Sequence, residues 1–127
     1  DRINIECLLK NDLQVLGDEP KIQQVITNFL TNAIRYTKPK GNIYVSTKLI
    51  NNKVLIEVEN EGEHIEEKEL LRIWDKFYKL DKSRNRKLGG TGLGLAIVKN
   101  ILKLHNSEYG VVNTKMGVKF YFTLNKS

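Results

Sequence analysis

The sequence lacks the features by which small proteins hold together without a large core. Cys7 is the only cysteine among 127 residues, so the chain can form no internal disulfide, and no cluster of cysteine and histidine offers a zinc site. No apolar run approaches the roughly 18 residues that a membrane-spanning helix requires. Repeats and low-complexity segments are also absent. With 40% hydrophobic residues, the chain is predicted to fold as a single domain, 1–127, around its own core.

The net charge of +6 would by itself suggest a nucleic-acid partner. The position of the charge argues against that reading. Segment 79–87 holds five basic residues and one acidic residue, so a net charge of +4 lies in one short loop, whereas 17–19 and 57–69 are acidic. Because the cations do not follow a helix or a strand, we predict no nucleic-acid partner. Without an apolar span, we also predict no membrane contact by this domain.

The longest periodic pattern predicts an amphipathic helix that begins after Asp18, a good N-cap residue, and ends before Pro39. Its apolar residues recur at intervals of three and four: Ile22, Val25, Ile26, Phe29, Leu30, Ala33 and Ile34. Alternating apolar residues predict two β-hairpins. In the first hairpin, Asn51-Asn52 suits the positive φ angles of a two-residue turn.

The complete set of elements predicts the fold class. The expected elements are a strand at 3–9, the long helix, strands at 43–49 and 54–58, a short helix at 66–72, a helix at 93–104, and strands at 108–113 and 118–124. Strands that come in hairpins favour a mixed, mostly antiparallel sheet, and the helices must cover one of its faces. The predicted fold is therefore α/β, a two-layer α/β sandwich. Trp74 and Phe77 are expected in its core.

The long helix carries an unusual polar flank. Asn28 and Asn32 are four residues apart, so both amides project from the same side, and Arg35 and Tyr36 extend that side by one turn. Amide oxygens beside a cation can ligate Mg²⁺ and meet phosphate oxygens. The alternative is that these are ordinary solvated residues, although asparagine is a mediocre helix former.

Two further stretches have polar or glycine-rich character. Asn60-Glu-Gly62-Glu-His-Ile follows a predicted strand and could hold the hydrogen-bonding edge of a heterocycle, or could be a plain turn. Segment 89–95 has four glycines and leads into a predicted helix, whose free N–H groups attract anions. With the cationic loop before it, polyphosphate is its expected ligand, and a flexible linker is the alternative. The segment fits neither a Walker A loop nor a dinucleotide-binding fingerprint.

Together these stretches resemble the catalytic ATP-binding domain of sensor histidine kinases, within the fold family shared with DNA gyrase, heat-shock chaperone and mismatch-repair ATPases. The similar motifs are an N box, Asn28-Phe-Leu-Thr-Asn32-Ala; a G1 box, Asn60-Glu-Gly62-Glu-His64-Ile65; an F box, Trp74-Asp-Lys-Phe77-Tyr78-Lys79; and a G2 box, Gly90-Thr-Gly92-Leu-Gly94-Leu. They follow the order of that family and span essentially the whole chain.

The resemblance implies ATP and Mg²⁺ as ligands. Asn32 would ligate the metal with Asn28 assisting, Asn60 would accept from the adenine amino group, and 78–92 would form a mobile lid. Asn28, Arg35 and Lys79 would act in catalysis. The residues expected to bind the nucleotide are Asn28, Asn32, Arg35, Tyr36, Asn60, Gly62, Ile65, Phe77, Tyr78, Lys79, Gly90, Thr91, Gly92, Leu93 and Gly94.

Two residues depart from the family pattern. The G1 box usually opens with Asp, whereas this chain has Asn60, whose amide can still accept a hydrogen bond but lacks the negative charge. His64 replaces the second G1 glycine. A third position concerns reaction type, because Asn28 stands where the hydrolysing relatives carry a glutamate that activates water. An amide cannot act as that base, so the site is predicted to hold ATP for another nucleophile.

The resemblance also implies partners. Neither His64 nor His105 lies in the sequence setting of a phosphoacceptor, so the chain is not expected to phosphorylate itself alone. The acceptor histidine would lie on a dimerisation domain of the same kinase, with a response regulator downstream. The chain would be a cytoplasmic part of a longer sensor in the cell membrane. The alternatives are a hydrolysing ATPase of this fold, an anti-sigma serine kinase, and an interaction module that no longer binds nucleotide.

Overall fold

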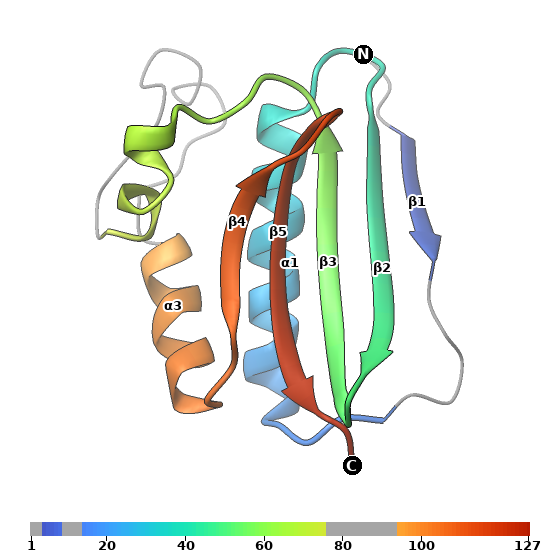
Figure 1. Cartoon of the computed structure of the whole chain (residues 1–127), viewed down its shortest axis with the longest axis vertical. Coiled ribbons are helices and arrows are strands. Elements are labelled where there is room, and N and C mark those ends of the chain that lie inside the picture. The colour runs from blue at the N-terminus through green and yellow to red at the C-terminus, as the bar shows by residue number, and fades with distance from the viewer. Residues whose placement is uncertain (1–3, 9–13, 76–93) are drawn as a thin grey trace.

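The computed structural model describes residues 4–8, 14–75 and 94–127 (Figure 1). Its elements are β1 (Asn4–Leu8), α1 (Glu19–Tyr36), β2 (Asn42–Ile50), β3 (Lys53–Glu61), η1 (Glu67–Glu69), η2 (Arg72–Trp74), α3 (Gly94–Leu104), β4 (Tyr109–Asn113) and β5 (Gly117–Asn125). The predictions for Phe77, Tyr78, Lys79 and residues 90–93, and the lid at 78–92, lie outside the described residues.

The strands form one sheet with the order β1-β2-β3-β5-β4. β1 pairs with β2 in parallel, and the other three pairs are antiparallel. Figure 1 shows α1 behind this sheet and α3 beside α1, so the helices cover one face and leave the other uncovered. The prediction of a two-layer α/β sandwich with a mixed, mostly antiparallel sheet is confirmed.

Helix α1 forms where the apolar spacing predicts it. Its N-terminus is capped by Asp18, whose Oδ1 accepts from the main-chain N–H of Lys21 at 3.2 Å. Pro20 occupies the first turn, where its missing N–H leaves no hydrogen bond unmade. The buried stripe consists of Ile22, Val25, Phe29 and Ala33. Ile34 lies beyond that stripe and is 44% exposed, so the apolar face is narrower than the sequence suggests.

The core is built around the ring of Phe29. It lies between the helix layer and the sheet, with its centroid 5.1 Å from that of Phe120 and 5.8 Å from that of Phe122. Trp74 packs edge-on against Phe29 at 6.2 Å and is 7% exposed, which confirms its predicted core position. Burying a side chain of this size stabilises the fold by about 1.5–3 kcal/mol. These rings therefore hold α1 and η2 against β5.

The short helix predicted at 66–72 is wrong, because the chain makes two separate 3₁₀ turns, η1 and η2. Residues 66–69 are Glu-Glu-Lys-Glu and offer no apolar residue to bury. The apolar residues Ile73 and Trp74 enter the core only in the second turn. Helix α3 meets its prediction within the described residues. Val98, Ile101 and Leu102 are buried, and Ile97 at the edge of this apolar face is 39% exposed.

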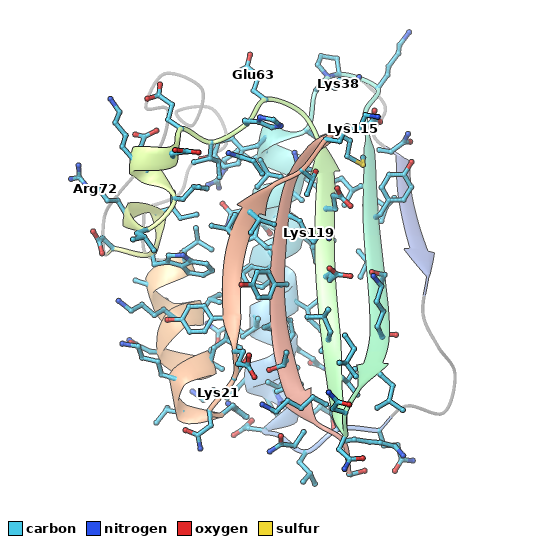
Figure 2. All side chains as sticks on the ribbon, viewed as in Figure 1. Lys21, Lys38, Glu63, Arg72, Lys115 and Lys119 are labelled. Atoms are coloured by element: carbon cyan, nitrogen blue, oxygen red, sulfur yellow. The ribbon has the colours of Figure 1, made fainter. Side chains whose placement is uncertain are left out.

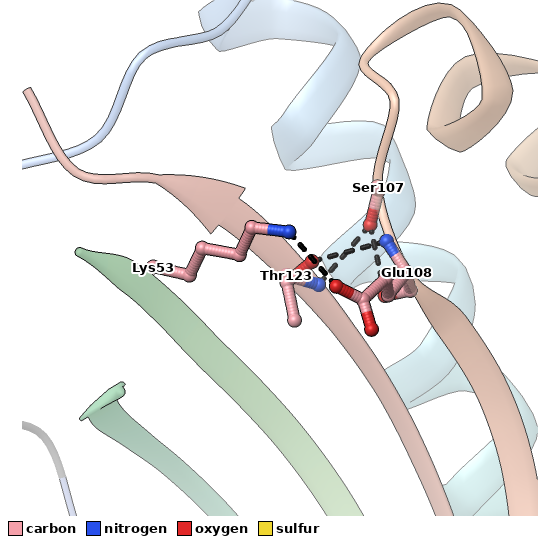
Figure 3. A network of polar contacts seen from close by, with 4 residues as sticks. All are labelled: Lys53, Ser107, Glu108 and Thr123. Carbon is pink, nitrogen blue, oxygen red and sulfur yellow. Dashed lines mark hydrogen bonds and ion pairs between the residues drawn. The ribbon is translucent and has the colours of Figure 1, made fainter. Parts of the chain in front are cut away.

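A polar network fixes the register of the β4–β5 hairpin at its open end (Figure 3). The main-chain N–H of Thr123 donates to the hydroxyl of Ser107 at 3.1 Å, and that of Glu108 donates to the Thr123 hydroxyl at 3.0 Å. Lys53 on β3 adds an ion pair with Glu108 at 2.8 Å. The pairing continues without slip to Asn113↔Val118, which brings the closing turn of the hairpin beside the end of β3.

The uncovered face of the sheet is charged. Glu57 on β3 is 8% exposed and forms ion pairs with Lys119 at 3.0 Å and Lys48 at 3.2 Å. Figure 2 shows Lys119 on the side of the sheet turned away from α1. Burial raises the pKa of the Glu57 carboxyl, but the hydrogen bonds and attraction of the two lysines outweigh that effect and hold the pKa below its ordinary value.

Candidate nucleotide-binding site

The polar flank of α1 presents an oxygen ligand. The Asn32 Nδ2 donates to the main-chain carbonyl of Asn28 at 3.1 Å. Because a carbonyl can only accept, the amide nitrogen must face it, and the Asn32 Oδ1 therefore occupies the other branch of the amide. Both residues are partly buried. Hard oxygen ligands of this kind suit Mg²⁺.

Helix α3 begins directly against this flank. A Cβ added to Gly94, the first residue of α3, would lie 3.2 Å from the Asn28 Oδ1. A larger residue would crowd that oxygen, so glycine permits the close approach of the two helices. The contact joins residues 66 positions apart in the chain, one from the N box and one from the G2 box. It also places the first free N–H groups of an 11-residue helix beside the asparagines.

The third motif reaches the same helix near its C-terminus. Asn60 ends the buried side of β3 and is 2% exposed. A Cβ on Gly62 would lie 2.7 Å from the main-chain oxygen of Tyr36 and 3.2 Å from the Asn60 Nδ2. Only glycine fits between these two groups without moving the backbone. The G1 segment is thus placed against the last turn of α1.

Glu61, the last residue of β3, binds the loop that follows α1. Its main-chain oxygen accepts from the Lys38 N–H at 3.0 Å, and its carboxylate accepts from the Asn42 N–H at 2.8 Å and pairs with the Lys38 Nζ at 3.5 Å. The Asn42 hydrogen bond, followed by the charge of Lys38, holds the pKa of the Glu61 carboxyl below its ordinary value. The loop between α1 and β2 is therefore tied to the end of β3.

Sequence reasoning missed the residues of the β4–β5 hairpin that hold the G1 segment. Asn113 uses both atoms of its amide: Oδ1 accepts from the Ile65 N–H at 2.9 Å, and Nδ2 donates to the Ile65 oxygen at 2.7 Å. The His64 Nε2 lies 2.6 Å from the Thr114 oxygen. A Cβ on Gly117 would lie 1.9 Å from the Asn60 oxygen. A glycine at the start of a strand was the available signal for such a close approach.

Among the described residues of the predicted site, two buried nitrogens have no hydrogen-bond partner, the Arg35 Nε and the Asn60 Nδ2. Both are donors, and an unpaired buried donor is unfavourable unless a ligand supplies an acceptor. Phosphate oxygens and the ring nitrogens of a base are such acceptors. The donor set therefore fits a nucleotide, and the Asn32 oxygen fits its metal ion.

The structure brings together most of the predicted site residues that it describes. Asn28 meets Gly94 and accepts a hydrogen bond from Asn32, and Tyr36 meets Gly62 and thereby Asn60. Figure 2 shows Lys38, Glu63 and Lys115 gathered at the end of the molecule where β3 finishes. The side chain of Ile65 is buried in the hydrophobic core, and its backbone is held by Asn113.

Other features of the described residues compete poorly as a site. A surface hollow of about 390 Å³ beside β4, lined among others by Trp74, Lys99 and Tyr109, includes none of the predicted residues among those described. Within the described ranges, no group of three or more His, Cys, Asp or Glu could hold a metal ion. No described helix combines the length and the apolar character needed to cross a bilayer.

Comparison with known sequences identifies the same region. Residues 17–127 match the family model described as histidine kinase-, DNA gyrase B-, and HSP90-like ATPase. The sensor histidine kinase CusS of Escherichia coli O157:H7 is 39% identical over 114 residues, which cover 90% of this chain and 24% of CusS. The sensor histidine kinase WalK of Bacillus subtilis (strain 168) is 41% identical over 106 residues, covering 82% of this chain and 17% of WalK. The chain therefore spans about a quarter or less of these relatives.

Solved structures agree on the fold. The catalytic domain of the histidine kinase ThkA, in a nucleotide-free form, superposes with a TM-score of 0.85 at 32% identity, covering 98% of this chain and 79% of that one. ThkA has also been solved in complex with the response regulator protein TrrA. That structure has a TM-score of 0.80 at 29% identity, covering 98% of this chain and 34% of that one.

Proposed function

Since the chain belongs to the family of histidine kinase-, DNA gyrase B- and HSP90-like ATPases, we propose that it is the catalytic ATP-binding domain of a sensor histidine kinase. It binds Mg-ATP and transfers the γ-phosphoryl group to a histidine of a separate dimerisation domain in the same kinase. The observation that carries this proposal is the meeting of three distant motifs on α1, through the contacts of Asn28 with Gly94 and of Tyr36 with Gly62.

Each side chain at the site has a role that follows from its chemistry. The Asn32 oxygen ligates Mg²⁺, and Asn28 assists. Arg35, one turn further along α1, directs its guanidinium donors to phosphate oxygens. The N–H groups at the start of α3 add fixed partial positive charge for the same oxygens. Bound ATP supplies the phosphoryl group, and the protein contributes positioning and charge stabilisation, which are the main requirements of this reaction.

The position of Asn28 supports transfer over hydrolysis. Its side chain lies beside the start of α3, and its main-chain oxygen accepts a hydrogen bond from the proposed metal ligand Asn32 one turn away. An amide has no basic lone pair near neutral pH and cannot take a proton from water. ATP held here is therefore expected to hydrolyse slowly and to wait for a stronger nucleophile, such as a neutral imidazole.

Both histidines of the chain are engaged in structural contacts, which supports an acceptor outside it. The His105 Nε2 accepts from the Asp18 N–H at 3.1 Å, and its Nδ1 lies 2.8 Å from the Ile101 oxygen. His64 is held against Thr114. Both ring nitrogens of His105 and one of His64 are therefore used in structural contacts, and the isolated chain is not expected to phosphorylate itself. A response regulator would take the phosphoryl group from the acceptor histidine, and use of ATP places this domain on the cytoplasmic side of a membrane sensor.

Calorimetry with a non-hydrolysable ATP analogue and Mg²⁺ tests the proposal. The natural chain should bind, and Asn32→Ala should weaken binding by at least about tenfold, because a metal ligand is lost. Thr31→Ala is a matched control: its hydroxyl also donates to a carbonyl four residues earlier, at 2.8 Å, but Thr31 is exposed and has no assigned role toward the metal.

Three results would contradict the proposal in different ways. No binding by the natural chain would favour an interaction module. Equal binding by the natural chain and Asn32→Ala would remove Asn32 from the metal site. Rapid ATP hydrolysis by the natural chain, without any acceptor domain, would favour an ATPase.

A further inference from the structure

The resemblance to sensor histidine kinases implies that the side chain of Asn60 contacts the base of the nucleotide. It lies on β3 between Ile43 of β2 and Val118 of β5, so its backbone is fixed by pairing on both sides. Residues 54, 56, 58 and 60 alternate toward the helix layer and are all buried. The amide of Asn60 therefore points toward α1 at the place where Gly62 approaches Tyr36.

Among the residues that the structure describes, none makes a hydrogen bond that would fix the orientation of the Asn60 amide. The Asn60 Nδ2 is buried and lacks a hydrogen-bond partner. A Cβ on residue 62 would lie 3.2 Å from this nitrogen and 2.7 Å from the Tyr36 main-chain oxygen, so only glycine at position 62 leaves this side of the amide uncrowded. The oxygen and nitrogen of an amide are nearly equal in size, so a half-turn about the last side-chain bond exchanges them with little steric change.

An amide that can turn serves two kinds of base edge. With its oxygen forward it accepts from the 6-amino group of adenine, and with its nitrogen forward it donates to the 6-oxo group of guanine or hypoxanthine. A carboxylate at the same place could only accept, and it would face a 6-oxo group with two acceptors opposed. The donor that the structure leaves unpaired at Asn60 is what a 6-oxo purine would satisfy.

We propose that Asn60 makes the base subsite tolerant at purine position 6, so that 6-oxo purine triphosphates bind alongside ATP. This inference rests on the proposed function and names a wider substrate class for the same site. The Asn60 amide turns to match the base, and selectivity for adenine is correspondingly low.

Equilibrium competition against a fluorescent ATP analogue, with Mg²⁺, tests the idea without any turnover. ATP and inosine triphosphate are the probes, since their bases differ in the hydrogen-bonding pattern at position 6 and at the adjacent N1. The natural chain should bind the two with dissociation constants within about tenfold. Asn60→Asp should raise the preference for ATP by about 10- to 100-fold, the discrimination that a matched base contact provides.

A matched control carries the same change of charge far from the base. Asn52→Asp alters the turn between β2 and β3, at the opposite end of β3, and aspartate tolerates its φ of 64° nearly as well as asparagine. Its preference between the two nucleotides should equal that of the natural chain. A thermal melt of each variant confirms that it is folded, and if Asn60→Asp does not fold, the ratio measured on the natural chain decides.

The possible outcomes distinguish a failure of this inference from a failure of the proposed function. Binding of ATP with inosine triphosphate more than tenfold weaker overturns the inference and leaves the proposed function intact. An unchanged ratio in folded Asn60→Asp also overturns it, because Asn60 would then not set the preference. Failure of the natural chain to bind either nucleotide overturns both.

Discussion

Substitution of Gly117 by alanine should damage both stability and nucleotide binding. The new Cβ would lie 1.9 Å from the main-chain oxygen of Asn60, and such contacts are essentially never closer than 3.0 Å. The strand ends must therefore separate by at least 1.1 Å, the difference between these two distances. Because the opposing atom belongs to the backbone of a central strand, no rotation of a side chain can relieve the contact.

The cost follows from that separation. Overpacking of this kind typically costs about 1–3 kcal/mol. The adjacent hydrogen bond from the Gly62 N–H to the Met116 oxygen, already 3.2 Å long, would also be lost, which adds about 0.5–1.5 kcal/mol. We expect Gly117→Ala to lower the free energy of unfolding by about 1.5–4.5 kcal/mol, measured by urea denaturation. Affinity for Mg-ATP should fall as well, because Asn60 and Gly62 are displaced.

Gly110→Ala is the matched control on the same hairpin. Its Cβ would lie 2.6 Å from the Tyr121 hydroxyl, but this ring belongs to a half-exposed side chain on the uncovered face and can swing away. The loss should be about 1 kcal/mol or less, with nucleotide binding unchanged. Equal losses for the two alanine variants, or a Gly117→Ala variant with natural stability, would refute the assigned close approach between β5 and β3.

Two further predictions concern the sheet face and the hairpin turn. Because the pKa of Glu57 is lowered in the folded protein, its stabilising effect is complete above the ordinary carboxyl pKa and is lost as the pH falls through the lowered value. Glu57→Gln should therefore lower the free energy of unfolding by about 1–2 kcal/mol at pH 7 and weaken the fall of stability with acid in a curve of stability against pH. An unchanged fall would contradict the role of the lysine pairs. Asn113→Ala should lower the free energy of unfolding by about 1–3 kcal/mol, because it leaves the N–H and oxygen of Ile65 unpaired. It should also weaken Mg-ATP binding in calorimetry. A destabilised variant that still binds with natural affinity would show that the Asn113–Ile65 contacts are structural only.

Local features of the fold could be predicted because neighbouring residues determine them. The cap at Asp18 and the buried stripe of α1 follow from spacing alone. Asn51 and Asn52 adopt φ angles of 48° and 64°, the positive values that their residue type suggested for the turn. Short segments with weak patterns were harder, and the η1 and η2 turns replaced the predicted helix at 66–72 because tertiary burial of Trp74 decided their geometry.

The candidate site could be predicted in its residues but not in its supports. Asn28 and Asn32 stand out because asparagine is a mediocre helix former in a strongly periodic helix, and Asn60 stands out because it directly follows a predicted strand. The contacts of Asn113 with Ile65 join positions 48 residues apart, and alternation along a strand does not say which distant strand it will meet. The approach of Gly117 to Asn60 depends in the same way on register between β3 and β5.

Segment 60–65 is held from both sides, by the loop after α1 through Glu61 and by the β4–β5 turn through Asn113. Its shape is therefore set when the chain folds, and little conformational entropy remains to be lost there when a ligand arrives. The entropy of ordering this segment is lost during folding and not on binding. The affinity of the preorganised segment therefore depends on distant parts of the chain that do not contact the ligand.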